Sequence, residues 1–468
     1  MRRMSTLTLA LITLLGGIAA GAEGAGVSYD IDLHVDLASG QYDGEATILW
    51  ANETGYPLEE VFFRLYANDD AIYGPARVDI PLIMVDGVEA DPLWFLDDTV
   101  VLVPLADPLG AGQTASLHLW FNGTTVDIRG READPGLGYG LLTQAAGTLV
   151  LSAFYPMIAP WTDEGWVLDP VEPIGDALFS DAADYRVYLT YDGDATPYAT
   201  GITVSHEASD AGGEAVFSVE NARDFTLVFA DGHKVVEAET SGVQLRAAFA
   251  QVLTAQETLD VARATLDFLT ERIGPLPYHE IELVEVPLHR VAGVEMTGVI
   301  LVSSQYSQRP DDAFFPVIIS HEMVHQWFYA AVGNDVFEDP WLDEGLVTYL
   351  SYVALGDLYG DSVRSMHTGN AQRAYGRIAE QYPALSIDDP LHRFPNSGVY
   401  SSFVYSGGAT LFDATHQYVG DEAFYDGLTR YYDTAIYTIA EPHVLIDALE
   451  AACGCDLTPL LDAFGVSR

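Results

Sequence analysis

The sequence predicts an α+β fold in which an antiparallel β domain precedes a mainly helical domain that contains a small sheet. Two observations support this prediction. From Val27 to about residue 240, short segments alternate apolar and polar residues between Gly, Pro, Asn and Asp, which is typical of strands and turns. From about residue 244 onward, apolar residues recur at helical spacing. Strands followed by helices favour an α+β arrangement.

The first predicted domain covers residues 27–240. Its clearest alternating segments are Tyr29–Val35, Glu45–Trp50 and Tyr185–Tyr191. The segment Phe154–Trp161 is rich in aromatic residues, and we interpret it as domain packing, because aromatic clusters bury large apolar areas.

The second predicted domain covers residues 244–468. Thr254 and Glu257 have the spacing of a capping box, and the helical pattern after them ends at Gly274-Pro275. Strands are predicted at 281–287 and 294–302. Further helices are predicted at about 312–330, 343–358, 361–380, 403–418, 421–433 and 441–452.

The chain is strongly acidic. It has 69 Asp and Glu residues against 20 Lys and Arg, a formal net charge of −49, and Lys234 is its single lysine. Because phosphates would be repelled, we expect no nucleic-acid partner and no anionic membrane partner. The charge is consistent with a solvated surface, and 49% hydrophobic residues are ample for a large core.

The N-terminus has the pattern of an export signal. Arg2 and Arg3 precede an apolar run from Leu7 to Ala20, and small residues follow at 20–22. We expect a signal peptide at 1–22 and a secreted, periplasmic or cell-surface protein. The run is too short for stable membrane insertion. Cys453 and Cys455 are compatible with either a disulfide or two thiols.

A metal site is predicted at His321-Glu322-Met-Val-His325. Residues four apart lie on one face of a helix, so both imidazoles can reach one zinc ion, and Glu322 can take a proton from water at that ion. The alternative is two surface histidines on an amphipathic helix. Glu344, after eighteen further residues, supplies a third ligand if the two helices pack antiparallel.

These residues closely resemble the aminopeptidase N family of gluzincin zinc metallopeptidases. The stretches HEMVHQWFYAAVGND and PWLDEGLVTYL are similar to the family, with Asp343 where Asn is more usual. The resemblance implies a thermolysin-like catalytic domain, one Zn²⁺ per chain, and an aminopeptidase acting on peptide substrates. Because the chain ends soon after the segment around Cys455, we expect a short form that lacks the family's C-terminal helical domain.

The resemblance also assigns a residue to the substrate's α-amine. Residues 292–296 fit the family's G-x-M-E-N segment, with Glu295 at the position of the amine-binding Glu. Ala292 replaces the first Gly and Met296 replaces the Asn. The alternative for Glu295 is an ordinary exposed strand residue.

Two further residues are assigned by the resemblance. Tyr405 lies at the position of the family's Y-x-K-G tyrosine, which stabilises the oxyanion, although Gly407 replaces the Lys and Tyr400 is a nearby competitor. Gln144 is the candidate for a second amine ligand from the β domain.

Two alternative functions remain open. One is a zinc endopeptidase or another gluzincin hydrolase, such as one acting on a lipid epoxide, without a free-amine requirement. The other is an inactive surface or binding module that keeps the fold. The sequence leaves the oligomeric state open.

Overall fold

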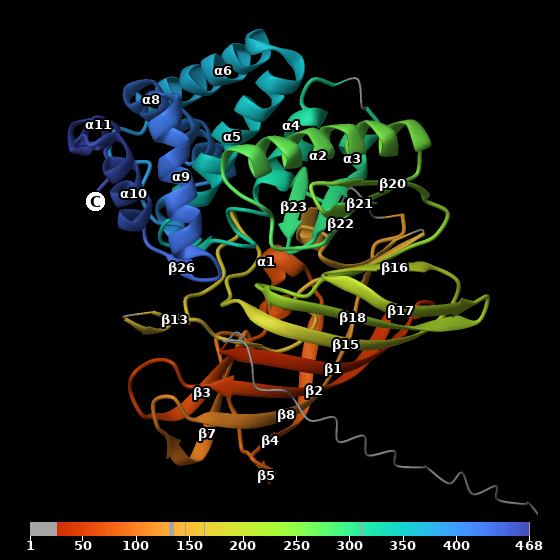
Figure 1. Ribbon diagram of the computed structural model, residues 1–468. Helices are drawn as coiled ribbons and strands as arrows, with labels where there is room; N and C mark the ends of the chain where they lie inside the picture. The colour runs from red at the N-terminus through yellow and green to blue at the C-terminus, as the bar shows by residue number, and fades with distance from the viewer. Residues whose placement is uncertain (1–25, 131–134, 146, 163, 310–311, 468) are drawn as a thin grey trace, which may run out of the picture.

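The computed structural model describes residues 26–467 apart from 131–134, 146, 163 and 310–311 (Figure 1). The predicted signal peptide at 1–22 lies outside the described residues. In Figure 1 the strands of the first domain, coloured red to yellow, form one part of the molecule, and the helices of the second domain, green to blue, form the other. This arrangement confirms the predicted order of a β domain followed by a mainly helical domain.

The first domain is built mainly from three sheets. The eight-stranded sheet has the order β17-β18-β15-β1-β2-β8-β4-β5, and its strands pair antiparallel except for β1 and β15, which are parallel. These strands are β1 (Val27–Asp36), β2 (Gln41–Ala51), β4 (Arg77–Val85), β5 (Val88–Glu89), β8 (Thr114–Thr124), β15 (Ala183–Asp192), β17 (Ile202–Ser209) and β18 (Gly212–Ala222).

The two smaller sheets complete this domain. The five-stranded sheet has the order β16-β19-β11-β10-β9 and the four-stranded sheet has the order β12-β3-β7-β6. Their strands are β3 (Leu58–Arg64), β6 (Leu93–Phe95), β7 (Val100–Leu109), β9 (Val126–Asp127), β10 (Leu142–Ala145), β11 (Thr148–Leu151), β12 (Met157–Ile158), β16 (Thr196–Ala199) and β19 (Leu227–Ala230). A short hairpin pairs β13 (Trp161–Thr162) with β14 (Gly165–Trp166).

The alternating apolar and polar residues of the predicted strands alternate between buried and solvent-facing positions in the structure. Along β1 the side chains of Tyr29, Ile31, Leu33 and Val35 are buried, and the polar residues between them face outward. The aromatic segment packs against the same face, since the Tyr155 ring lies edge-on to Tyr29 with centroids 5.7 Å apart. The packing interpretation of that segment is therefore confirmed.

The second domain begins with its own five-stranded sheet, in the order β20-β21-β22-β24-β23. Its strands are β20 (Lys234–Thr240), β21 (Val243–Phe249), β22 (Glu280–Val286), β23 (Gly293–Met296) and β24 (Val299–Ser303). The last strand of the β domain ends at Ala230, and the first strand of the second domain's sheet begins at Lys234 and pairs with β21. The boundary between the sheets therefore lies before the predicted boundary at residues 240–244. The predicted strand at 294–302 is a hairpin of two strands that turns at Gly298, whose φ is +68°.

Helices account for most of the remaining chain. They are α1 (Asp70–Tyr73), α2 (Val252–Arg272), α3 (Ser304–Ser307), α4 (Phe315–Val324), α5 (Trp341–Tyr359), α6 (Asp361–Ala379), α7 (Ser397–Phe403), α8 (Tyr405–Val419), α9 (Asp421–Ala435), α10 (Pro442–Cys453) and α11 (Thr458–Phe464). Two short strands, β25 (Gly333–Asn334) and β26 (Ile439–Ala440), pair parallel.

Two details of the helix prediction are wrong. The capping box at Thr254 is not formed, because α2 begins at Val252 with Gln251 as N-cap and Thr254 is buried within the helix. The helix predicted at 312–330 ends at Val324. Beyond that point the backbone turns, and Tyr329 adopts a φ of +137°.

Hydrogen bonds of two buried charged side chains, Arg223 and Asp224, join the two domains. Arg223 donates from Nε to the carbonyl oxygen of Tyr329 (2.6 Å) and from Nη2 to that of Thr438 (2.6 Å). Its neighbour Asp224 accepts hydrogen bonds from the backbone N–H and the hydroxyl of Thr297 (2.9 Å each) and from the Tyr329 hydroxyl (3.0 Å). These bonds fasten the β23–β24 hairpin to the β domain.

Cys453 and Cys455 form a disulfide at the end of α10, which settles the choice between disulfide and thiols. Among the helices that the structure describes, none combines the length and apolar character needed to cross a membrane.

Candidate metal centre and active-site cleft

Five of the predicted site residues line one cleft of about 440 Å³: Glu295, His321, Glu322, Glu344 and Tyr405. Strand β23 and the segment before it, helices α4, α5, α7 and α8, and two loops of the β domain contribute to its walls. The charged and aromatic residues that line it are Tyr139, Asp176, Arg290, Glu295, Phe314, His321, Glu322, Glu344, Tyr352, Tyr400 and Tyr405.

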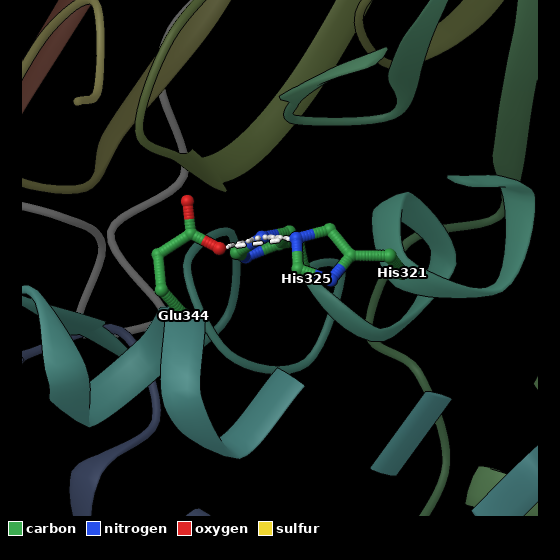
Figure 2. A group of neighbouring side chains, drawn as sticks. All are labelled: His321, His325 and Glu344. Atoms are coloured by element: carbon green, nitrogen blue, oxygen red, sulfur yellow. Dashed lines mark hydrogen bonds and ion pairs between the residues drawn. The ribbon is translucent and has the colours of Figure 1, made fainter. Parts of the chain in front are cut away.

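Three side chains converge at the base of the cleft, and we name them the metal triad: His321, His325 and Glu344 (Figure 2). His321 Nε2 lies 3.0 Å from Glu344 Oε2 and 3.1 Å from His325 Nε2, and His325 Nε2 lies 3.4 Å from the same carboxylate oxygen. The two imidazoles lie one helical turn apart, since His321 is in α4 and His325 caps its C-terminal end. Glu344 comes from the first turn of α5. The predicted convergence is therefore present.

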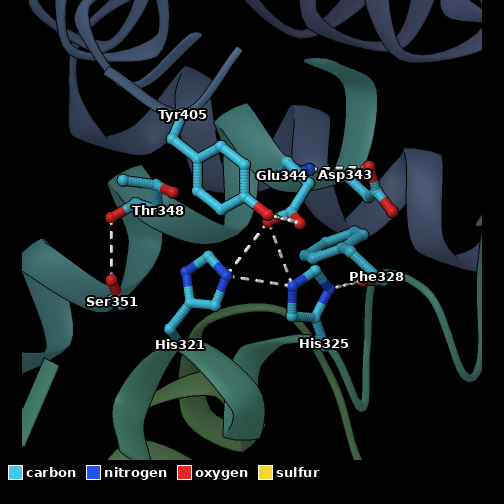
Figure 3. Close-up of polar contacts among 8 residues, drawn as sticks. All are labelled: His321, His325, Phe328, Asp343, Glu344, Thr348, Ser351 and Tyr405. Carbon is cyan, nitrogen blue, oxygen red and sulfur yellow. Dashed lines mark hydrogen bonds and ion pairs between the residues drawn. The ribbon is translucent and has the colours of Figure 1, made fainter. Parts of the chain in front are cut away.

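The metal triad fits a zinc ion. Ligand bonds of about 2.0–2.1 Å in tetrahedral directions place neighbouring ligand atoms about 3.3–3.4 Å apart, close to the spacings seen here. His325 Nδ1 lies 3.0 Å from the carbonyl oxygen of Phe328, and a proton donated there leaves Nε2 free as a ligand (Figure 3). Two imidazoles and one carboxylate are a donor set of catalytic zinc sites.

Glu344 is held in its ionised form. Burial alone would raise its pKa, but hydrogen bonds from His321 and His325 outweigh that effect and hold the pKa well below its usual range. Its other oxygen, Oε1, accepts a hydrogen bond from the Tyr405 hydroxyl (Figure 3). Asp343 accepts a hydrogen bond from the Glu344 backbone N–H at 2.7 Å, and burial beside Glu344 raises the pKa of Asp343 to about 8.

Glu322 lies between the metal triad and β23. Its carboxyl is buried, and its Oε2 has no hydrogen-bond partner among the described residues. Burial, followed by the nearby Glu295 carboxylate, raises the pKa of Glu322 well above its usual value. A buried carboxyl with high proton affinity and an unused oxygen is suited to accept and release a proton.

Glu295 faces the cleft from β23, at the edge of the sheet. Carboxylate and imidazole atoms of Glu295, Glu322 and His325 lie within 4.8 Å of one another, so Glu295 is part of the site rather than an ordinary exposed strand residue. Burial raises the pKa of Glu295. The next residue, Met296, points into the core, where the Ser152 hydroxyl lies 3.6 Å from its sulfur.

Tyr405 rather than Tyr400 reaches the metal triad. The Tyr405 ring stacks on His321 with centroids 5.7 Å apart and planes 15° from parallel, and its hydroxyl contacts Glu344. Burial, and then the Glu344 charge, raise the pKa of Tyr405 well above its usual value, so its hydroxyl keeps its proton. Tyr400 packs edge-on against Tyr405, and its own hydroxyl is buried without a partner among the described residues.

Gln144 is not brought to the cleft. Its side chain is buried in β10 and donates a hydrogen bond to the carbonyl oxygen of Leu37, inside the β domain. The β domain instead contributes Tyr139 and Asp176 to the cleft wall. Asp176 is buried, with Oδ2 unpartnered among the described residues. No local pattern distinguishes Asp176 in the sequence, because a single acidic residue in a Gly-containing loop is common.

Comparison with known proteins finds similarity to peptidases. Residues 257–464 match the model of the peptidase family M1 domain. Aminopeptidase M1 of Arabidopsis thaliana is 25% identical over 251 residues, which are 49% of this chain and 27% of that protein. Aminopeptidase N of Streptomyces lividans is 26% identical over 245 residues, 48% of this chain and 28% of that protein. The chain thus covers little more than a quarter of these relatives.

Solved structures show the same fold over nearly the whole chain. The crystal structure of an M1 zinc metallopeptidase from Deinococcus radiodurans aligns with a TM-score of 0.67 and 21% identity, covering 95% of each chain. A mutant of a metallopeptidase from the same organism, bound to a Tyr-Ser-Ala substrate, aligns with the same TM-score and 20% identity, again over 95% of each chain. The family M1 domain at residues 257–464, the metal triad and the similarity to these aminopeptidases together support the aminopeptidase N-like gluzincin family.

Proposed function

We propose that this protein is a zinc-dependent aminopeptidase that releases N-terminal residues from peptides. The observation that carries the proposal is the position of Glu295, whose carboxylate lies in the same buried cluster as Glu322 and His325. A substrate ammonium bound by Glu295 would place the first peptide bond beside the metal triad and the catalytic base. The names of the relatives, which include several aminopeptidases, support the same activity.

Each side chain of the site has a chemical task. Zinc held by the metal triad would supply Lewis acidity, which polarises the scissile carbonyl and makes water more acidic. Glu322 accepts the proton of the attacking water at its free oxygen and delivers it to the leaving amine nitrogen as the C–N bond breaks. Tyr405 keeps its proton and donates a hydrogen bond to the oxyanion that develops on the carbonyl oxygen.

The charge of the cleft favours a cationic group of the substrate. Asp176 is buried and Glu295 is half-buried, and loss of solvent raises the pKa of both carboxyls. The charge of Glu344 further disfavours their anionic forms. A substrate ammonium would relieve this repulsion, because a buried carboxylate is stabilised when an opposite charge joins it. A blocked N-terminus provides no such charge.

The amine requirement separates this proposal from an endopeptidase or another zinc hydrolase. The test compares an amino-acid amide panel with the N-acetylated forms, with and without a chelator. We expect hydrolysis of the free amines only, lost on chelation and restored by zinc. Equal cleavage of acetylated substrates would contradict the aminopeptidase proposal and favour the alternative.

The catalytic base has its own test, which also addresses an inactive module. Glu322→Gln removes the proton acceptor and keeps the shape of the side chain, so we expect the variant to retain one zinc per chain and to lose hydrolysis. Turnover by the zinc-loaded variant would contradict the role of Glu322. A wild-type protein that binds no zinc would favour the inactive module.

We also propose that the protein is exported. The signal-like pattern of residues 1–22 and the disulfide between Cys453 and Cys455 support an oxidising compartment outside the cytoplasm. N-terminal sequencing of the protein recovered from its natural host tests this proposal. We expect a mature chain that starts near Glu23, and an intact Met1 on cytoplasmic protein would contradict it.

A further inference from the structure

Arg290 is the one Arg or Lys among the described residues that line the cleft. Four carboxyl side chains share that lining with it: Asp176, Glu295, Glu322 and Glu344. The whole chain has only 20 Lys and Arg residues against 69 acidic ones. The permanent positive charge of Arg290 therefore lies in an otherwise acidic cleft, where it can bind an anionic group of a ligand.

The guanidinium of Arg290 is fixed but not neutralised. Nη1 donates to the carbonyl oxygen of Ala71 at 2.9 Å, and Nη2 donates to that of Pro173. Its central carbon lies 5.0 Å from the centroid of the Tyr139 ring. Within the described part of the chain, no carboxylate forms an ion pair with it. Two of its five N–H groups are used by carbonyls, so the others and the full charge remain for a ligand.

The order of residues along β23 gives the direction of a bound peptide. β23 is the last strand of its sheet, so its outer edge can receive an extended peptide. Glu295 lies near its C-terminal end. Gly293, two residues earlier, lies against the catalytic base, because a Cβ at Gly293 would be only 2.3 Å from Glu322 Oε1. Arg290 follows three residues further back, where a φ of +65° bends the chain.

A substrate therefore runs antiparallel to β23, from Glu295 past Glu322 toward Arg290. Its N-terminus lies at Glu295 and its scissile bond at Glu322, so the part after that bond extends toward Arg290. Three residues of extended chain, from 293 to 290, span at most about 10 Å, which is the length of two or three substrate residues.

We propose that Arg290 binds the C-terminal carboxylate of short substrates, so that the preferred substrates are peptides of three or four residues. This inference rests on the proposed aminopeptidase function. A planar guanidinium matches a carboxylate with two parallel hydrogen bonds, which gives the contact directional selectivity as well as charge. A long peptide has no carboxylate at this position and loses the contact.

The test compares one tripeptide, Ala-Ala-Ala, with its C-terminal amide. For the wild-type protein we expect a KM about 10- to 100-fold lower for the free carboxylate, the range for hydrogen bonds to charged groups. Arg290→Ala should remove this difference and leave kcat and KM for the amide within about twofold. Arg290→Lys should keep part of it. Arg377→Ala, which removes an exposed charge on α6 that is not part of the cleft lining, should keep all of it.

Two outcomes would overturn the inference. Equal KM values for acid and amide in the wild-type protein would do so without any variant. If Arg290→Ala impaired both substrates equally, Arg290 would be a structural support for the segments of Ala71 and Pro173. Should that variant fail to fold, Arg290→Gln keeps hydrogen-bond donors without the charge and answers the same question. Cleavage of neither peptide would instead contradict the proposed function itself.

Discussion

Replacing Tyr405 by Phe should lower kcat by about 10²- to 10³-fold. The ring stacks on His321 and packs against Tyr400, so Phe keeps both contacts and loses only the hydroxyl. Loss of one donor to a developing oxyanion costs about 2.7–4 kcal/mol. The hydroxyl also bonds to Glu344, and loss of such a partner of a metal ligand weakens zinc binding by about 10- to 100-fold.

These two effects are separated by assaying at saturating zinc and measuring the metal content of the same sample. A fully loaded Tyr405→Phe protein should show the loss in kcat with little change in KM. Tyr400→Phe is the matched control, because the Tyr400 hydroxyl is buried without a partner among the described residues and its removal should change kcat less than about threefold. Tyr405→Phe activity within threefold of the wild-type value, or an equal loss in both variants, would refute the oxyanion role.

Three further predictions follow from the site and its surroundings. Chelation should lower the melting temperature by a few degrees, since zinc at a hundredfold excess over its Kd contributes about 2.7 kcal/mol, and an unchanged melting curve would argue against a bound metal. Glu295→Gln should lower kcat/KM for amino-acid amides by about 10- to 100-fold, and activity equal to wild type would exclude an ammonium contact. Burial, with the charges of Asp335 and Glu338, raises the pKa of Asp339 to about 7. The folded state therefore holds this proton more tightly than the unfolded state, and stability should fall as pH rises from about 4 to 7. Asp339→Asn should abolish that loss and be more stable by about 1–2 kcal/mol at pH 8 in urea unfolding, with no difference at pH 4.

The metal triad could be predicted from the sequence because its three residues lie within 24 positions of one another, on two consecutive helices. His321 and His325 share a helix face through their spacing alone, and Glu344 needed only that two consecutive helices pack together. Glu295 and Tyr405 were reached through family resemblance, and the structure places both in the cleft. These residues lie in segments whose own sequence pattern defines the element that carries them.

Residues contributed by loops were not predicted, because long-range packing decides where a loop lies. Gln144 was chosen from the β domain, but its strand turns it toward Leu37. Asp176 and Arg290 reach the cleft only because the two domains pack together, and neither has a periodic pattern around it. The helix predicted through residue 330 stops early for the same reason, since the turn at Tyr329 provides the carbonyl that Arg223 binds.

The buried junction at Arg223 and Asp224 restricts how the catalytic half can be studied or engineered. Asp224 accepts two hydrogen bonds from Thr297, the residue that directly follows β23. The position of β23, the strand proposed to bind the peptide, is therefore fixed in part by a side chain from the other domain. Separating the two domains would leave Arg223 and Asp224 in the β domain without their partners from the catalytic half, a loss of several kcal/mol. A fragment starting with β20 at Lys234 would keep the residues of the metal triad but lack Asp224, the partner that holds Thr297. We expect such a truncation to weaken peptide hydrolysis more than zinc binding.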